Sequence, residues 1–416
     1  MYLPSLSLPR ILLVGLALPG ALMANFTGDW PAWRGPTGDG QAAAGQEVPV
    51  KWSETENVIW RAPIHGRGHG SPTVVGNRVY LTTADVAKQE QFVVCLDRAS
   101  GQPVWETVVH RGPLETKGHR NSSAASSTLV WDGERFFVNF HHREAVHTTA
   151  LDATGKILWQ QRIGDFVMHQ GFGSSPVVHE SVVVVTADHR GGGKVAGLDR
   201  RTGRIVWQQD RPQIANYTSA AIVAAAGRPQ AVVAGCNLIS SFDPLTGKKL
   251  WEIAGATEEC VVTAVTDGQR VFVSGGYPKN NVTAVEADGS GRIAWQNGNR
   301  LYVPSMLVRD GHIYAVLDAG QAVCWKSDTG EERWREKVDR DFYASPVMFG
   351  SRVYATSQRG VTSVFEATPQ AYRLIAQNPL GDEALASPAI CGGRLYLRSA
   401  KKTGEVRQEY VWCIGQ

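Results

Sequence analysis

The sequence predicts an all-β protein folded as one eight-bladed β-propeller of four-stranded antiparallel blades. The first observation is a repeated phrase in which an apolar residue and Asp precede a Gly-containing turn and then a Trp, as in Leu198-Asp199, Gly203 and Trp207. The second is the spacing of these Trp residues, 54, 48, 44, 44 and 39 residues, which is the period of a four-stranded blade. The third is that short strands alternate with Gly, Asn and Asp turns without a helical period. Since a propeller closes its repeats into one unit, the 416 residues need not divide into two or three domains.

The first two dozen residues differ from the rest. Arg10 precedes an apolar run over residues 11–18, Pro19-Gly20 breaks the run, and small residues continue to Ala24. This order is typical of a secretory signal peptide, here residues 1–24. A membrane anchor is the alternative, but the run is shorter than the ~18 apolar residues that a span requires. We therefore expect an exported, periplasmic or extracellular protein without a transmembrane span in its mature chain.

The remaining chain divides into an extension at 25–56 and the propeller at 57–416. Each repeat opens with a Ser-containing segment and an apolar strand, and it ends with the Asp-turn-Gly-Trp hairpin. Eight openings indicate eight blades; they lie near Ser71, Ser126, Ser175, Ser219, Val261, Ser305, Ser345 and Ser387.

The last two blades depart from the pattern. The seventh has residues 366–372 in place of the turn and lacks its Trp, and the eighth contains only three strands. The segment around Trp60 matches the Trp strand of a repeat, although no strands precede it. We therefore expect Val58-Ile59-Trp60-Arg61 to pair with the strand around Cys413 and to close the ring, which hides edges that would otherwise aggregate.

The repeated phrase has a structural explanation. Gly takes the positive-φ position of the hairpin, and Asp or Thr accepts hydrogen bonds from turn amides. The Trp is expected to lie flat between neighbouring blades, with its N–H donating to a backbone carbonyl.

Charge and cysteine content restrict the function classes. The net charge of +3, without a Lys/Arg-rich run, gives no case for a nucleic-acid partner. Cys95, Cys324 and Cys413 occupy equivalent third-strand positions of different blades, so they are expected to be buried small hydrophobes. Cys236 and Cys260 fall in loops and remain the one candidate disulfide pair.

The Asp-x-x-Thr-Gly-x-x-x-Trp phrase, repeated from Trp60 to Trp334, resembles the tryptophan-docking repeat of the pyrroloquinoline-quinone (PQQ)-like β-propellers. That family contains quinoprotein dehydrogenases and BamB, the propeller of the outer-membrane β-barrel assembly machine. The segments 30–36 and 52–60 resemble the opening of exported PQQ-like repeat proteins of planctomycete-type bacteria. The resemblance covers the chain after residue 57 and implies the quinoprotein alcohol dehydrogenase-like fold.

The resemblance leaves two classes of function open. A quinoprotein dehydrogenase would have a vicinal Cys pair over the quinone, a Trp floor, an Asp base and a Ca²⁺ site of Glu, Asn and Asp. The sequence has no adjacent Cys pair and no assignable calcium set, so no cofactor is expected, with PQQ and calcium as the alternative. A BamB-like role implies a protein partner, although no Cys follows the apolar run as a lipid anchor would require.

Histidines gather on one expected face. In a propeller the loops before the first strand and after the second open on the same side. By this rule the following histidines lie on or near that face: His69, His119, His141, His142, His169 and His189. Together with Asp188 such a cluster could bind a divalent metal, but the spacing is no metal motif, so we expect a polar funnel instead.

Aromatic and acidic residues just before the first strands are expected to rim the same channel. They are Phe172, Tyr217, Tyr302, Phe342 and Tyr343 with Glu258, Glu259 and Asp341. Such a funnel could take a peptide, a sugar or a partner loop, or these side chains could simply fill the channel. The candidate binding residues of the channel face are His69, His119, His169, Phe172, Asp188, His189, Tyr217, Glu258, Tyr302 and Tyr343.

These observations favour a monomeric, exported, non-catalytic propeller that binds a protein or peptide partner in the cell envelope or a small ligand in its funnel. Its role would be that of a scaffold, including BamB-like work in outer-membrane protein assembly. The alternative is a PQQ- or metal-dependent oxidoreductase. No catalytic residue, cofactor-binding residue or metal ligand is assigned.

Overall fold

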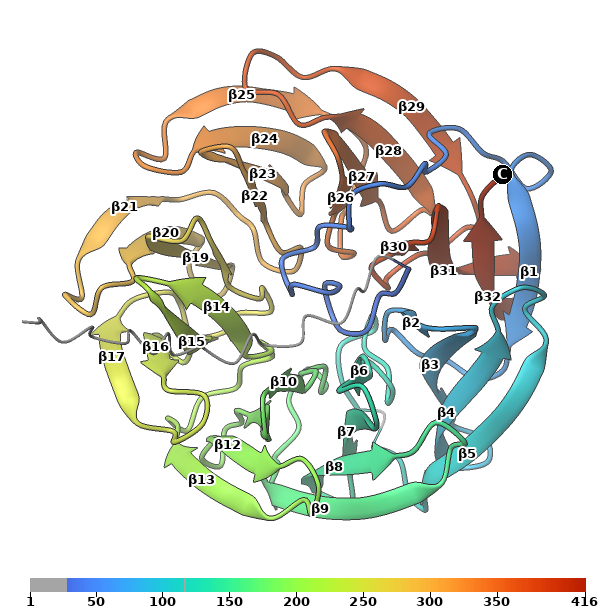
Figure 1. The fold of residues 1–416 in the computed structure, drawn as a ribbon, viewed down its shortest axis with the longest axis horizontal. Coiled ribbons are helices and arrows are strands. Elements are labelled where there is room, and N and C mark those ends of the chain that lie inside the picture. Colours follow the sequence, from blue (N-terminus) through green and yellow to red (C-terminus); the bar gives the residue numbers. More distant parts are fainter. Residues whose placement is uncertain (1–27, 116) are drawn as a thin grey trace, which may run out of the picture.

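The computed structural model describes residues 28–115 and 117–416, which form eight four-stranded antiparallel sheets around a central axis (Figure 1). Each sheet is one blade, and every regular element of the described residues is a strand. The predicted all-β, eight-bladed propeller is confirmed. The signal peptide predicted at 1–24 lies outside the described residues. Within 28–115 and 117–416 no helix has the length and apolar character to cross a membrane.

The first four blades follow one another along the chain. Blade 1 contains β2 (Thr73–Val75), β3 (Arg78–Asp85), β4 (Glu90–Asp97) and β5 (Pro103–Arg111). Blade 2 contains β6 (Val130–Trp131), β7 (Phe136–His142), β8 (Ala145–Leu151) and β9 (Ile157–Asp165). Blade 3 contains β10 (Val177–His179), β11 (Val182–Ala187), β12 (Lys194–Asp199) and β13 (Ile205–Asp210). Blade 4 contains β14 (Ala221–Ala225), β15 (Arg228–Gly235), β16 (Leu238–Phe242) and β17 (Lys249–Ala254).

The last four blades complete the ring. Blade 5 contains β18 (Val265–Thr266), β19 (Arg270–Gly275), β20 (Asn281–Glu286) and β21 (Ile293–Asn297). Blade 6 contains β22 (Leu307–Arg309), β23 (His312–Val316), β24 (Gln321–Lys326) and β25 (Glu332–Lys337). Blade 7 contains β26 (Val347–Phe349), β27 (Arg352–Thr356), β28 (Val361–Glu366) and β29 (Leu374–Pro379). Blade 8 contains β30 (Ala389–Cys391), β31 (Arg394–Thr403), β32 (Val406–Ile414) and β1 (Val58–Ile64).

The ring closes as predicted, because β1 pairs antiparallel with β32 and Trp60 lies opposite Cys413. Blade 8 is therefore assembled from two distant parts of the chain, with strand order β1-β32-β31-β30. The pairing gives the outer edge of β32 a partner, so the exposed edge that this strand would otherwise present is covered.

The repeated Trp residues join neighbouring blades. Trp207 Nε1 donates to the carbonyl of Pro244 at 3.1 Å, and Trp60 Nε1 donates to that of Arg98 at 2.9 Å. The same bond to the next blade's turn is made by Trp105, Trp159, Trp295 and Trp334. Trp251 differs, since its Nε1 donates to Gln230 of its own blade at 2.7 Å. The predicted role of the Trp phrase is confirmed at these six joints.

Near the axis, Ser and Thr hydroxyls join the openings of the blades. At six joints the backbone N–H of one blade's Ser or Thr donates to the hydroxyl of the next, at 2.8–3.1 Å. The residues in ring order are Ser71, Thr128, Ser175 and Ser219, then Thr263, Ser305, Ser345 and Ser387. Of the openings that the sequence singled out, Ser71, Ser175, Ser219, Ser305, Ser345 and Ser387 thus form part of an inner belt of hydrogen bonds, whereas in blade 2 Thr128 takes this role in place of Ser126.

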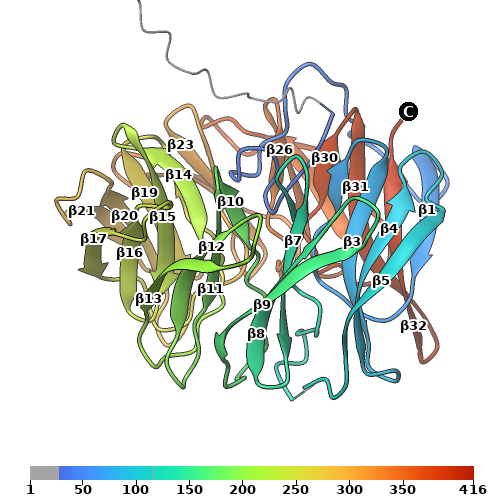
Figure 2. The ribbon, with the colours of Figure 1, turned by 60° about the horizontal axis from the view of Figure 1, so that its bottom comes forward.

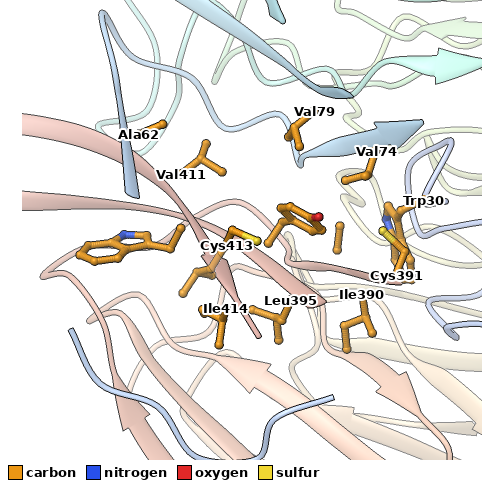
Figure 3. Packing of buried hydrophobic residues seen from close by; sticks show 14 of the residues in the cluster. Trp30, Ala62, Val74, Val79, Ile390, Cys391, Leu395, Val411, Cys413 and Ile414 are labelled. Carbon is orange, nitrogen blue, oxygen red and sulfur yellow. The ribbon is translucent and has the colours of Figure 1, made fainter. Parts of the chain in front are cut away.

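Residues 28–57 pack across one face of the ring, opposite the turn between β31 and β32 (Figure 2). Trp30 exchanges two backbone hydrogen bonds with Val74 of β2, and Ala42 donates to the carbonyl of Met348 of β26. Trp30 is 1% exposed and belongs to a core shared by blades 1, 7 and 8. Figure 3 shows it beside Val74 and Cys391. This segment, hereafter the plug, covers the axis from that side.

All six cysteines are buried and free, including Cys236 and Cys260. The structure therefore contains no disulfide between the candidate pair. Burial raises the pKa of both thiols above its usual value, so they stay protonated at neutral pH.

Candidate functional site

A cavity of about 690 Å³ lies on the propeller axis. Its wall is formed by the loops before the first strands and between the second and third strands, and Trp33 of the plug contributes from the opposite side. Trp33 Nε1 donates to the hydroxyl of Thr263 in the inner belt at 2.8 Å, which fixes the indole across the channel. The plug thus forms a floor, and the cavity has the size and aromatic lining of a ligand pocket.

One wall of the cavity carries three carboxylates, those of Glu259, Asp318 and Asp341, which we call the acidic wall. Glu259 precedes β18, Asp318 lies between β23 and β24, and Asp341 precedes β26. They therefore come from the successive blades 5, 6 and 7. Tyr217, Tyr277, Tyr302 and Tyr343 line the cavity on the same side.

Glu259 is only 3% exposed and is held by two partners. The Tyr302 hydroxyl donates to its Oε2 at 2.9 Å, and His169 Nδ1 lies 3.3 Å from its Oε1. Arg190 donates to His169 Nε2 at 2.8 Å, so the ring proton is on Nδ1 and faces Glu259 and the Tyr217 hydroxyl. Burial and the Glu259 charge raise the pKa of Tyr302, which remains a donor.

Asp318 is less well compensated. Its Oδ2 accepts the backbone N–H of Tyr302 at 2.7 Å, and Arg300 lies over the Tyr302 ring at 5.8 Å. Burial nevertheless raises the pKa of Asp318, and neither the Tyr302 amide nor the Arg300 charge cancels that effect. An added positive charge would therefore stabilise the ionised form of this carboxyl.

The opposite wall is basic and polar. His119, Arg120 and Asn121 precede β6, and the Asn121 amide donates to Gln358 of blade 7 at 3.2 Å across the cavity mouth. His69 precedes β2, and burial followed by the charges of Arg67, Arg398 and Arg407 lowers its pKa. His69 is therefore neutral, and Arg120 is the permanent charge of this wall.

The structure brings six of the ten predicted residues to the cavity. They are His69, His119, Phe172, Tyr217, Tyr302 and Tyr343. His169 lies behind the wall, where it contacts Tyr217 and Glu259.

Three predicted residues lie elsewhere. Asp188 is 3% exposed and forms a buried ion pair with Arg211 at 3.2 Å. His189 is equally buried, and its Nδ1 accepts the backbone N–H groups of Val167 and Gly191 at 3.0 and 3.1 Å. Glu258, which lies at a bend of the loop before β18, does not line the cavity, whereas its neighbour Glu259 does. Phe342, expected on the rim, is 0% exposed and belongs to the core between blades 6 and 7.

Sequence reasoning did not single out Trp33, Asp318, Arg300 or Gln358. Asp318 and Gln358 occupy the loop after the second strand of blades 6 and 7, so the rule that placed His141 on this face could have found them. Nothing local in the sequence places Trp33 in the channel, since its position depends on contacts across the ring.

Other histidines group between blades 1 and 2. The rings of His110 and His142 stack with centroids 4.7 Å apart, and His147 lies 5.3 Å from His110. Burial lowers the pKa of all three, that of His110 to about 3, and neighbouring Arg143 and Arg162 act in the same direction. In the residues that the structure describes, no group of three or more His, Cys, Asp or Glu is arranged to hold a metal ion.

The cavity does not fit the quinone site that the family resemblance implies. None of the six cysteines is adjacent to another in sequence, and none lines the cavity. The lining carries three carboxylates, which would repel the carboxylates of the quinone, and they form no metal-holding group among the described residues. We therefore derive no chemistry from PQQ.

Comparison with known proteins finds the same fold in several solved structures and sequence similarity to BamB. The chain is 24% identical over 341 residues to the outer membrane protein assembly factor BamB of Yersinia pestis, which covers 77% of this chain and 81% of that protein. The crystal structure of BamB from Moraxella catarrhalis matches with a TM-score of 0.60 and 15% identity, over 85% of this chain and 99% of that one. Quinohemoprotein alcohol dehydrogenase from Comamonas testosteroni matches with a TM-score of 0.65 and 13% identity, over 94% and 81%. At these identities the structural matches show the fold alone.

The family described as outer membrane protein assembly factor BamB matches residues 34–148, 89–298 and 278–407. These matches span nearly all of the propeller, including the Trp joints, the closing strand and the loops of the central cavity. The chain therefore belongs to this BamB family of PQQ-like β-propellers.

Proposed function

We propose that this protein is an exported, non-catalytic scaffold that binds a protein partner through the face that carries the central cavity, and that it serves outer-membrane protein assembly. The observation that carries the proposal is a family match from residue 34 to residue 407 to a protein named for that assembly. The leader pattern of residues 1–24 supports export to the periplasm.

The form of the cavity supports binding rather than turnover. The plug closes one side with Trp33, so access is from the side of the long loops. The exposed Tyr277 and the half-buried Tyr302 and Tyr343 contribute aromatic surface there, and such residues dominate the energetics of protein interfaces. The buried Glu259 is fixed by Tyr302 and His169, which makes it a preorganised part of the wall.

Capture from an envelope extract of the source organism tests this function. Immobilised mature protein is compared with the variant Tyr343→Lys, which places a positive charge on the cavity face, and with the control Asp328→Asn on an exposed blade turn. We expect an outer-membrane β-barrel protein or a component of its assembly machinery to be enriched by the wild type and the control, and reduced at least fivefold by Tyr343→Lys. Equal capture by all three proteins would contradict the proposed face.

The oxidoreductase alternative is tested separately. Purified protein is mixed with PQQ and Ca²⁺, its absorbance is recorded, and alcohol oxidation is followed with an electron-accepting dye. We expect no turnover above the protein-free control. Turnover that saturates at one PQQ per chain would overturn the non-catalytic assignment.

A further inference from the structure

The central cavity is electrically polarised. Glu259, Asp318 and Asp341 lie on the side of blades 5 to 7, whereas Arg120 lies on the side of blade 2. Since the walls are close and partly desolvated, this separation produces a stronger field than the same charges would on an open surface. A ligand with one localised positive charge is favoured near the acidic wall.

The charges already present on the acidic wall do not neutralise it. Arg300 supplies one positive charge near Asp318, and Arg190 reaches Glu259 only through His169. Asp341 is exposed on the cavity side of blade 7. Two cations therefore face three carboxylates, and Asp318 retains the raised pKa of a half-buried carboxyl whose charge is incompletely compensated.

Aromatic rings complete a site for a cation. Four tyrosines line the cavity beside the carboxylates, and the faces of such rings attract ammonium and guanidinium groups. The Arg300 guanidinium over the Tyr302 ring shows this contact within the protein itself.

The size of the cavity restricts which kind of cationic ligand it can bind. A volume of about 690 Å³ is far larger than a metal ion needs and suits an amino-acid side chain with part of its backbone. The Trp33 floor stops a chain from threading through, so a side chain has to enter from the loop side. Arg120 on the opposite wall disfavours a run of positive charges and so favours a single basic residue.

We propose that the central cavity binds one Arg or Lys side chain of a partner polypeptide, with the cationic group between Asp318 and Asp341 and against the tyrosines. This inference rests on the proposed function, because it names the feature of the partner that the cavity recognises. The hydroxyl belt below the site is neutral and the opposite wall is basic. The acidic wall is therefore the part of the cavity that contacts the cationic group.

Short peptides test the proposal directly. Blocked Gly-Gly-Arg-Gly-Gly is titrated into the full-length mature protein by calorimetry, beside the same peptide with citrulline, the neutral isostere of Arg, and a third peptide with Glu. We expect the Arg peptide to bind at least tenfold more tightly than the citrulline peptide, and the Glu peptide to show no binding. Equal affinity for Arg and citrulline would overturn the proposal.

Two variants locate the contact. Asp318→Asn keeps an oxygen for the Tyr302 amide, and Asp341→Asn changes an exposed residue, so both should fold with a melting temperature close to that of the wild type. Each should weaken Arg-peptide binding at least fivefold, whereas Asp328→Asn, on an exposed turn outside the cavity, should not. Unchanged affinity in both cavity variants would refute the acidic wall as the site.

The outcomes separate this inference from the proposed function. Capture of an assembly protein by the wild type without any preference for Arg over citrulline would defeat the cavity proposal alone. Preference for Arg with no assembly protein captured would defeat the proposed function alone.

Discussion

The indole of Trp207 lies directly over Gly247 of the next blade, so that a Cβ at position 247 would be 2.5 Å from the ring. The same Gly has φ +69°, and the Trp207 N–H donates to Pro244 in the same turn. Two separate constraints, backbone conformation and space for the ring, therefore require Gly at this point of the repeat. Equivalent close approaches occur at Gly101, Gly155, Gly203 and Gly330.

Substitution of Gly247 separates these two constraints. Gly247→Ala should lower the free energy of unfolding by more than the ~1–2 kcal/mol that a positive φ alone costs a residue with a Cβ. The matched control is Gly311→Ala, where φ is +71° and no atom lies within 4 Å of the added Cβ. Urea denaturation of both variants measures the difference, and equal losses would show that the ring contact has no energetic weight.

Trp207→Ala removes the other side of the joint. Because the indole is 8% exposed, we expect a loss of roughly 3–5 kcal/mol, as for other large aromatic residues in cores. Its neighbour Val206, 42% exposed, serves as the control, and Val206→Ala should change stability by less than about 0.5 kcal/mol. A Trp207→Ala protein that is as stable as the wild type, yet deficient in peptide binding, would assign Trp207 to a binding site instead.

Removal of residues 57–64 tests the closure of the ring. The deletion takes away β1 and the Trp60 bond to Arg98, and it leaves β32 with an unpaired edge. We expect aggregation or a melting temperature lowered by more than 10 °C, which light scattering and calorimetry would record. Shortening the exposed tip between β31 and β32 at 404–405 is the control and should cause neither. An unchanged melting temperature after deletion of β1 would contradict its role in closure.

The histidine group between blades 1 and 2 predicts acid sensitivity. His110, His142 and His147 have pKa values lowered by burial, so they are neutral in the folded protein and become protonated on unfolding below about pH 6.5. Stability should therefore fall as pH drops below about 6.5, by up to about 1.4 kcal/mol per pH unit for each group that titrates only when unfolded.

A variant identifies the groups responsible. His142→Phe retains a ring against His110 and removes one titrating group, so the stability difference between pH 7.5 and pH 5.0 should be smaller than in the wild type. His312→Gln, at the partly exposed start of β23, should leave that difference as it is. Urea denaturation at the two pH values measures this difference. The same change in the free energy of unfolding for all three proteins would refute the prediction.

Metal removal should have no effect. The described residues offer no group of three or more ligating side chains around one point, and His119 and His169 occupy separate surroundings at and behind the cavity wall. We expect elemental analysis to find less than about 0.1 zinc, copper or iron per chain, and chelator treatment to leave the melting temperature unchanged. About one metal per chain, lost in the double variant His119→Ala and His169→Ala, would support the oxidoreductase alternative.

The sequence was sufficient for the fold because its signals are local and repeated. The residues of each Asp-turn-Gly-Trp phrase determine the geometry of its own turn. The single Trp strand around Trp60 could be matched to the blade at Cys413, which has only three strands of its own. The joint at Trp251 departs from the pattern because Gln230 lies between the indole and the next turn: it accepts the Trp251 N–H and donates its own amide to the Ala287 carbonyl at 2.9 Å.

The site was predicted only in part, because side-chain direction and pairing depend on tertiary contacts. The loop rule placed Tyr217 and Tyr302 correctly at the cavity, but it could not show that Asp188 is turned into the core by Arg211. Nor could it choose between Glu258 and Glu259, since it does not show the bend of the loop at Glu258. The position of Trp33 depends on Thr263, which lies 230 residues away in sequence.

The pairing of β1 with β32 has a consequence for the order of folding. Trp60 and Cys413 are separated by about 350 residues, so blade 8 can form only after the other seven blades have been synthesised. Contacts of such high sequence separation slow folding, since the loop that they close is entropically costly. During this interval β1 is a hydrophobic strand without a partner, and its unpaired edge is open to pairing with other chains. The time of greatest vulnerability to aggregation is therefore before the C-terminal strand becomes available.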